Sequence, residues 1–159
     1  MTQKTFSNLL KAVIILAFLC CLVVYALYVP AVAEECRLMY DELASLYWPA
    51  LIFIELTVLP VLTAFVLSWL IARDIGRDQS FTYVNARRMK AISFLALGDV
   101  FYFIAGICVL WCFGAASGPM LILVMLISAA GVIAAVCTGA LSHLIYKAAV
   151  LREEHDLTV

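Results

Sequence analysis

The chain has 159 residues, of which 67% are hydrophobic and 13% are charged, with a net charge of −1 and a mean hydropathy of +1.11. This length excludes two sizeable domains, and the charged fraction is about half of the roughly 25% that is usual in soluble proteins. A chain this small has too little interior to hide so much apolar surface, which excludes an ordinary soluble fold and predicts an integral membrane protein.

Charged residues divide the chain into four apolar stretches. Ala12–Ala33 and Pro119–Tyr146 contain no Asp, Glu, Lys or Arg, while Leu43–Ala72 and Ala91–Gly118 each contain one carboxylate. A helix needs about 20 apolar residues to cross about 30 Å of hydrocarbon, and an open strand would leave backbone groups unpaired in lipid. The sequence therefore predicts a single all-α integral membrane domain, residues 1–159, folded as an antiparallel four-helix transmembrane bundle. The expected spans are about 10–33, 46–72, 90–112 and 119–146.

The first apolar stretch also resembles a secretory signal peptide. Lys4 and Lys11 form a basic start, and Ala-Val-Ala at 31–33 forms a small-residue cleavage site before Glu34. The apolar core of about 19 residues exceeds the usual 7–15 of a signal peptide. We therefore expect a retained membrane span, with cleavage after residue 33 as the alternative.

Lys and Arg are distributed unevenly about these four spans. The N-terminus, the connection 73–90 (called the elbow) and the tail 147–159 share one side, which holds nine of the ten Lys and Arg residues. Arg37 alone lies on the other side, in an acidic loop. The positive-inside rule then predicts that both termini are cytoplasmic and that the protein is a multi-pass protein of the cell (inner) membrane. Aromatic residues expected at the two interfaces are Tyr25, Tyr28, Tyr47, Trp48 and Trp111 outside, and Trp69, Tyr83 and Tyr146 inside.

The elbow holds most of this positive charge. Its cations are Arg73, Arg77, Arg87, Arg88 and Lys90. We interpret them first as topology determinants that also hold anionic lipid headgroups, at about 1 kcal/mol per charge, with a protein partner as the alternative. Direct nucleic-acid binding is disfavoured because no folded module surrounds them and because Asp74 and Asp78 dilute the charge. Thr82 is a candidate N-cap for a helix that continues to about residue 112.

Glu55 and Asp99 are ionisable residues inside the second and third spans, where such residues are candidates for function. By helix rise their depths differ by about 10 Å, so direct pairing is not expected. No Lys or Arg lies at either depth, so we expect both carboxyls to be protonated. They form either a proton or cation site with nearby Tyr102, or a structural set of interhelical hydrogen bonds. Pro60 cannot donate to the carbonyl of Leu56, which predicts a kink beside Glu55.

The fourth span carries a stripe of small residues. Gly131, Ala135, Gly139 and His143 recur every four residues, a spacing that lets another helix approach closely. For His143, we expect an interfacial histidine with its hydrogen bonds satisfied rather than a proton relay or a metal ligand. The six cysteines contain neither a C-x-x-C pair nor a zinc spacing, so we expect buried small hydrophobic residues. Cys36 in the outer loop is available for an intermolecular bridge.

Two segments resemble a known family. The segment SFTYVNARRMKAIS, residues 80–93, is similar to the FT…N…R-(L/M)-K-x-I signature before the third span of the domain of unknown function 2975 family. The closing LREEHDLTV is similar to that family's L-x-E-E-x-D-L-T-(I/V) ending, and the four-span layout matches along the chain. The resemblance implies a small bacterial or archaeal four-helix membrane protein without an assigned reaction. It also implies a neighbouring gene for a small helix-turn-helix regulator of the Cro/repressor type, and it brings no catalytic residues.

The C-terminal tail has no role as a membrane anchor. Its acids are Glu153, Glu154 and Asp156, and its apolar residues are Leu151, Leu157 and Val159. We expect the tail to fold back, so that its acids meet Arg87, Arg88 or Lys90 while its apolar residues pack on the inner rim. The alternative is a docking peptide for a soluble partner.

No phosphate loop, nucleophile elbow, metalloprotease motif or serine triad occurs, so no enzyme, cofactor or metal site is expected. We expect a non-enzymatic membrane protein whose elbow and tail present a cytoplasmic surface to a protein partner, which by the resemblance is a small helix-turn-helix regulator. The rival hypothesis is a small, homo-oligomeric proton- or cation-coupled transporter that uses Glu55 and Asp99. A membrane thiol oxidoreductase is a distant third.

Overall fold

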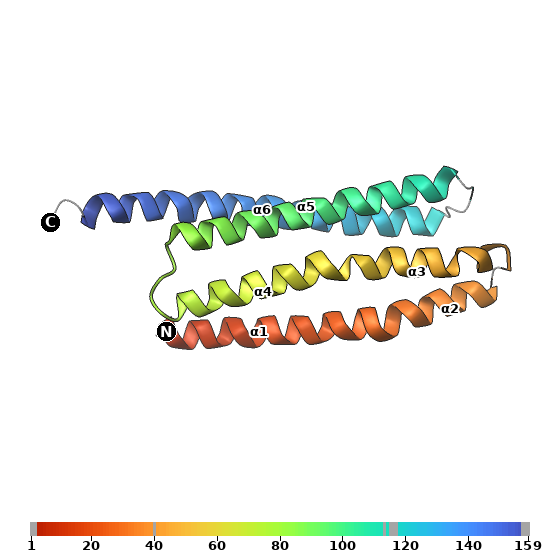
Figure 1. Ribbon diagram of the computed structural model, residues 1–159, viewed down its shortest axis with the longest axis horizontal. Helices are drawn as coiled ribbons and strands as arrows, with labels where there is room; N and C mark the ends of the chain where they lie inside the picture. Colours follow the sequence, from red (N-terminus) through yellow and green to blue (C-terminus); the bar gives the residue numbers. More distant parts are fainter. Residues whose placement is uncertain (1–2, 40, 113, 115–117, 157–159) are drawn as a thin grey trace.

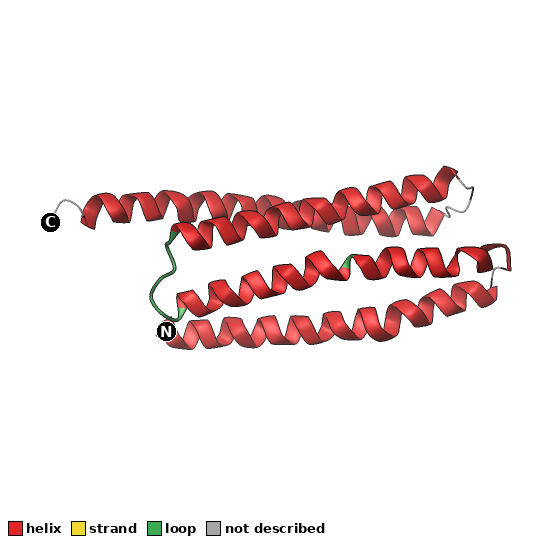
Figure 2. Cartoon of the chain, in the orientation of Figure 1, coloured by secondary structure: helices red, strands yellow, loops and turns green. Residues whose placement is uncertain are grey.

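The computed structural model describes residues 3–39, 41–112, 114 and 118–156, and this part of the chain is helical and contains no strand (Figure 2). In chain order the elements are α1 (Gln3–Val23), a π-helical turn (Val24–Tyr28), α2 (Val29–Met39), a 3-10 turn (Asp41–Leu46), α3 (Tyr47–Leu56), α4 (Val58–Ile75), α5 (Tyr83–Cys112) and α6 (Gly118–Asp156).

In the described part of the chain, four helical segments are long and apolar enough to cross a membrane. They are Gln3–Met39, Ala44–Ile75, Tyr83–Cys112 and Met120–Glu153. The expected all-α class with four such helices is confirmed, and the chain is a multi-pass membrane protein. The last helix, α6, has 39 residues and is therefore about 58 Å long at 1.5 Å per residue, well beyond the thickness of the hydrocarbon layer.

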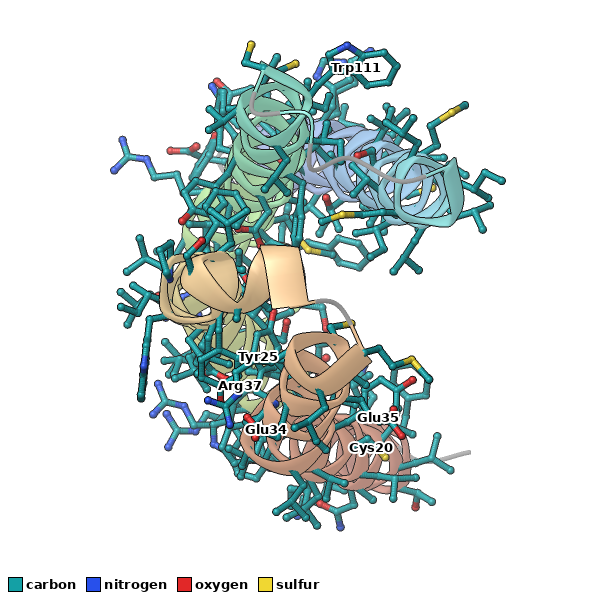
Figure 3. All side chains as sticks on the ribbon, turned by 90° about the vertical axis from the view of Figure 1, so that its right-hand side faces the viewer. Cys20, Tyr25, Glu34, Glu35, Arg37 and Trp111 are labelled. Carbon is teal, nitrogen blue, oxygen red and sulfur yellow. The ribbon has the colours of Figure 1, made fainter. Side chains whose placement is uncertain are left out.

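Consecutive spans pack side by side: α1 of the first span on α4 of the second, α4 on α5 of the third, and α5 on α6 of the fourth. The starts of α1 and α5 and the ends of α4 and α6 lie at the same end of the molecule (Figure 1). We call this end the basic end because nine of the ten Lys and Arg residues belong to it. Arg37 belongs to the opposite end, which Figure 3 views along the helices.

The four spans form a curved row, with α1 and α6 at its two ends (Figure 3). This arrangement is more open than the expected bundle. Few side chains are buried as a result: the buried apolar residues of the described chain are Ile71, Ala72, Ala86, Val100, Ala135 and Ala149. Lipid chains are as apolar as leucine, so hydrophobicity gives these helices little reason to close into a ring.

Serine hydroxyls join neighbouring helices at three places. Ser7 of α1 donates to the carbonyl of Ala72 of α4, at 2.7 Å. Ser93 of α5 donates to the carbonyl of Ala135, and Ser142 of α6 donates to the carbonyl of Ala86, both also at 2.7 Å. Small residues bring the backbones close enough for such bonds, which are a common link between membrane helices.

The small-residue stripe of α6 lies against α5. A Cβ added at Gly131 would come 2.5 Å from Cγ2 of Val100, and one at Gly139 would come 3.2 Å from Oγ of Ser93. Ala135, between them, is only 1% exposed. His143 is exposed and does not extend this contact.

Prolines interrupt the first two spans. Pro60 has no N–H for the carbonyl of Leu56, and the helix breaks at Thr57, as the sequence predicts, where the Thr57 hydroxyl donates to the Ile54 carbonyl at 2.7 Å. Figure 2 shows this break as a short loop inside the second span. The π-helical turn Val24–Tyr28 comes just before Pro30 and accommodates that proline in the same way.

Candidate functional site

The elbow is held by a buried hydrogen-bond network rather than by loose surface charges. Nη1 of Arg88 lies 2.5 Å from Oδ2 of Asp74, and these side chains are only 18% and 13% exposed. The same nitrogen donates to Oδ1 of Asn85 at 2.9 Å. Arg88 thus ties the start of α5 to the end of α4.

Asn85 fixes the loop between these two helices. It is fully buried, and its amide nitrogen donates to the carbonyl of Gln79 at 2.9 Å. Its backbone N–H donates to the hydroxyl of Thr82 at 3.4 Å, which confirms the predicted N-cap. The FT…N…R signature contains these three residues, Thr82, Asn85 and Arg88. Their hydrogen bonds hold the elbow in place, which gives the signature a structural explanation.

The other predicted cations of the elbow are more accessible. Arg77, Arg87 and Lys90 are exposed, and Lys90 lies 5.8 Å above the ring of Phe94. Arg73 has a side chain that is 44% exposed and lies 3.6 Å from Asp74. Four of the five cations are therefore available to lipid or to a partner, and Arg88 is not.

The expectation that the tail folds back is wrong for residues 147–156, which continue α6. This part of α6 runs past the start of α5 (Figure 1). The segment contains neither Gly nor Pro and consists largely of good helix formers, so nothing ends the helix there. The side chains of Glu154 and Asp156, and residues 157–159, lie outside what the structure describes.

One tail acid does contact the elbow, although not through a cation. The hydroxyl of Tyr83 donates to Oε2 of Glu153 at 2.7 Å, and the Tyr83 ring packs edge-on against Tyr146, with centroids 5.4 Å apart. A cavity of about 480 Å³ lies beside this contact. We call it the elbow pocket; its lining includes Gln79, Phe81, Tyr83, Ala149, Arg152 and Glu153.

The predicted intramembrane carboxyls form no hydrogen bond or ion pair with the described residues. Both Glu55 of α3 and Asp99 of α5 are half-buried. Tyr102 instead stacks on Phe53, with centroids 4.1 Å apart, and donates to the Phe53 carbonyl at 3.1 Å. The expected interhelical hydrogen bonds of the carboxyls are therefore absent from this part of the structure.

Sequence reasoning missed the polar pair beside these carboxyls. The hydroxyls of Tyr25 and Thr57 lie 2.7 Å apart, and Thr57 follows Glu55 by two residues. Tyr25 lies in the π-helical turn and Thr57 at the helix break, so the two irregular segments meet here. Tyr25 and Thr57 each precede a proline by a few residues. This feature of the sequence could have pointed to the pair. The interpretation of Tyr25 as a member of the outer aromatic belt is thus incomplete.

The structure places the six cysteines differently from the expectation. All six cysteines are free; Cys20, Cys36, Cys108, Cys112 and Cys137 are exposed, and Cys21 is half-buried. The expectation that they are buried is wrong, because a curved row of helices has little interior. In the described chain no group of three or more His, Cys, Asp or Glu residues is placed to hold a metal ion.

The family model described as protein of unknown function (DUF2975) matches residues 31–159. The chain belongs to the DUF2975 family. The match contains the elbow and α3 to α6 and begins within α2, so the DUF2975 similarity covers most, not all, of the chain. No curated protein and no solved structure matches it.

Proposed function

We propose that this DUF2975 protein is a non-enzymatic membrane tether whose basic end holds a small helix-turn-helix regulator at the cytoplasmic face of the inner membrane. In this proposal the four helices form an antiparallel arrangement with both termini in the cytoplasm. The nine-to-one distribution of Lys and Arg supports that orientation. The observation that carries the tether is the elbow pocket.

The elbow pocket has the properties of a protein-docking surface. Phe81, which lines the pocket, is 53% exposed, and Leu151, which precedes the lining residue Arg152, is 66% exposed. In the cytoplasm, such apolar side chains gain nothing unless a partner covers them. Arg152 and Glu153 supply charges at the edge, and the network around Asn85 holds the loop in one conformation. A pre-ordered surface loses little entropy on binding.

A direct binding measurement tests this proposal. The protein in nanodiscs and the purified regulator encoded by the adjacent gene should associate, and Phe81→Ala and Leu151→Ala should each weaken binding about tenfold, as expected for apolar anchors. Leu38→Ala is the matched control, because Leu38 is 72% exposed at the opposite end. Absence of binding by the wild-type protein would contradict the tether.

The orientation has its own test. Cys36 is exposed, so it can report alone in a variant that lacks the other cysteines. A membrane-impermeant thiol reagent should label Cys36 in intact cells, and a cysteine placed at Ser80 should react only after the membrane is opened. Labelling of the Ser80 position from outside would reject the orientation.

Transport of a proton or cation is the second candidate function. The observation that favours it is that Glu55 and Asp99 form no hydrogen bond or ion pair in the described chain. A carboxyl with no fixed partner can bind and release a proton or cation, and two irregular helix segments lie beside it. In proteoliposomes, Glu55→Gln and Asp99→Asn should abolish a pH-driven flux while the fold is retained. Equal flux in these variants and in the wild type would exclude this candidate.

A further inference from the structure

A second cavity at the basic end has a lining whose charged residues are all cations. It lies between the start of α1 and the end of α4 and has a volume of about 340 Å³. The cations are Lys4 and Lys11 from α1, Arg73 from α4 and Arg77 from the turn that follows. We call this cavity the basic pocket.

Close helix packing builds the basic pocket. Ser7, which lines it, is 1% exposed and donates to the carbonyl of Ala72 at 2.7 Å. A Cβ on Gly76 would come 2.7 Å from the Ser7 hydroxyl oxygen, so the absence of a side chain at Gly76 permits this contact. Lys4, Ser7 and Lys11 share one face of α1, because they are three and four residues apart. This close packing of α1 on α4 fixes the backbone positions from which the cations project.

The neighbouring carboxylate offsets only part of the positive charge of the pocket. Asp74 lies 2.5 Å from Arg88 on the other side of α4, and its contact with Arg73 is longer, at 3.6 Å. Asp78 follows Arg77 in the sequence but is not among the residues that line the pocket. Four like charges that converge on one cavity repel one another, and an anion in the cavity would relieve this repulsion.

Trp69 indicates the depth of the basic pocket in the membrane. The Lys11 ammonium lies 5.9 Å from the centre of the Trp69 ring, which is 39% exposed. Tryptophan favours the membrane–water interface, where the headgroups of phospholipids lie. Arg73 comes one helical turn after Trp69, about 6 Å further toward the basic end. With Trp69 at the interface, Lys11 and Arg73 would lie near the level of the phosphate groups, and Lys4 and Arg77 would lie further toward the water.

We propose that the basic pocket binds a phosphate group. Guanidinium groups pair with phosphate oxygens through two parallel hydrogen bonds, and ammonium groups add point charges, so two arginines with two lysines fit this ligand. The phosphate belongs to the headgroup of an anionic phospholipid or to a soluble phosphate compound. This inference concerns α1 and α4, whereas the elbow pocket lies on α5 and α6, and neither depends on the other.

The fluorescence of Trp69 provides a local probe. The chain has three tryptophans, so Trp48→Phe with Trp111→Phe leaves Trp69 as the only indole. This protein, in phosphatidylcholine nanodiscs at constant ionic strength, is titrated with phosphatidylglycerol in the discs and separately with inorganic phosphate in the buffer. We expect a saturable change in Trp69 emission with at least one of the two probes.

Matched charge variants test whether the pocket itself binds. Lys4→Gln with Arg77→Gln removes two pocket cations and should weaken binding about thirtyfold. Arg87→Gln with Lys90→Gln removes two exposed cations at the same end and should change affinity by less than about threefold, the residual effect of distant charges. Lys11→Gln with Arg73→Gln is the second pocket pair, should the first fail to fold.

Each outcome of these titrations decides the proposal. A response to phosphatidylglycerol alone supports a lipid headgroup, and a response to inorganic phosphate that competes with lipid supports a soluble phosphate compound. The proposal is overturned if neither probe gives saturation. It is also overturned if Arg87→Gln with Lys90→Gln weakens binding as much as a pocket pair does, since the attraction would then come from overall surface charge.

Discussion

The elbow and the middle of the membrane-spanning region treat their polar side chains in opposite ways. In the elbow, Asp74, Asn85 and Arg88 are nearly or fully buried and bond to one another. In the middle, Glu55 and Asp99 are half-buried and have no hydrogen bond or ion pair in the described chain. A buried polar group that is satisfied holds the fold together, whereas an unsatisfied one costs stability and is available for another task.

The largest loss of stability is expected when a buried polar side chain of the elbow loses its hydrogen-bond partner. Arg88→Met leaves the nearly buried Asp74 with only the longer, 3.6 Å contact to Arg73, which should lower the free energy of unfolding by about 3 kcal/mol. Thermal unfolding in detergent micelles measures this loss. Arg87→Met is the matched control, because Arg87 is exposed and should tolerate the change. Equal losses in the two variants would mean that the Asp74–Arg88 contact does not hold the elbow.

A second elbow variant should have a somewhat smaller effect. Asn85→Ala removes the amide that binds the Gln79 carbonyl and the Arg88 guanidinium, at an expected cost of about 2 kcal/mol. Hydrogen exchange at residues 76–82 should rise in this variant, because that loop loses its hydrogen bond to the Asn85 side chain. Exchange in α1 should not change. Unchanged protection of the loop would show that Asn85 does not position it.

The elbow and the tail show which features the sequence could and could not predict. The four spans and the Thr82 cap follow from local patterns, namely the length of an apolar run and a hydroxyl before a helix. The Asp74–Arg88 pair joins residues on two helices across a loop, and in the sequence it looked like surface charge. The expected ion pairs of the tail require the helix to end near residue 147, but residues 147–156 have an intrinsic tendency to continue it.

The candidate site in the middle was predicted only in part. Glu55, Asp99 and Tyr102 stood out because charged or polar residues are rare in apolar runs. The contact of Tyr25 with Thr57 spans 32 positions and depends on how α4 packs on α1 and on two proline-induced irregularities. No local pattern specifies that geometry.

In the middle of the spans, removal of charge should not weaken the fold. Because Glu55 and Asp99 form no hydrogen bond or ion pair in the described chain, Glu55→Leu and Asp99→Leu should leave stability unchanged or raise it by up to about 2 kcal/mol. Tyr102→Phe is the contrasting variant, since it removes a bond to the Phe53 carbonyl and should lower stability by about 0.6 kcal/mol. Unfolding in mixed micelles measures all three. A clear loss in either leucine variant would reveal a partner for that carboxyl in the membrane, such as a second copy of the chain.

The smallest expected effect compares a satisfied hydroxyl with an unsatisfied one on the same helix. Ser142 of α6 donates to the Ala86 carbonyl at 2.7 Å, whereas the buried hydroxyl of Ser128 has no partner in the described chain. Ser142→Ala should therefore cost about 0.6 kcal/mol, the typical value for a hydrogen bond between membrane helices. Ser128→Ala removes an unpaired polar atom and should cost nothing. Both variants keep α6 equally helical, so circular dichroism controls for local propensity while unfolding reports the difference. A loss in Ser128→Ala as large as that in Ser142→Ala would show that hydroxyls on α6 act through something other than the bond to α5.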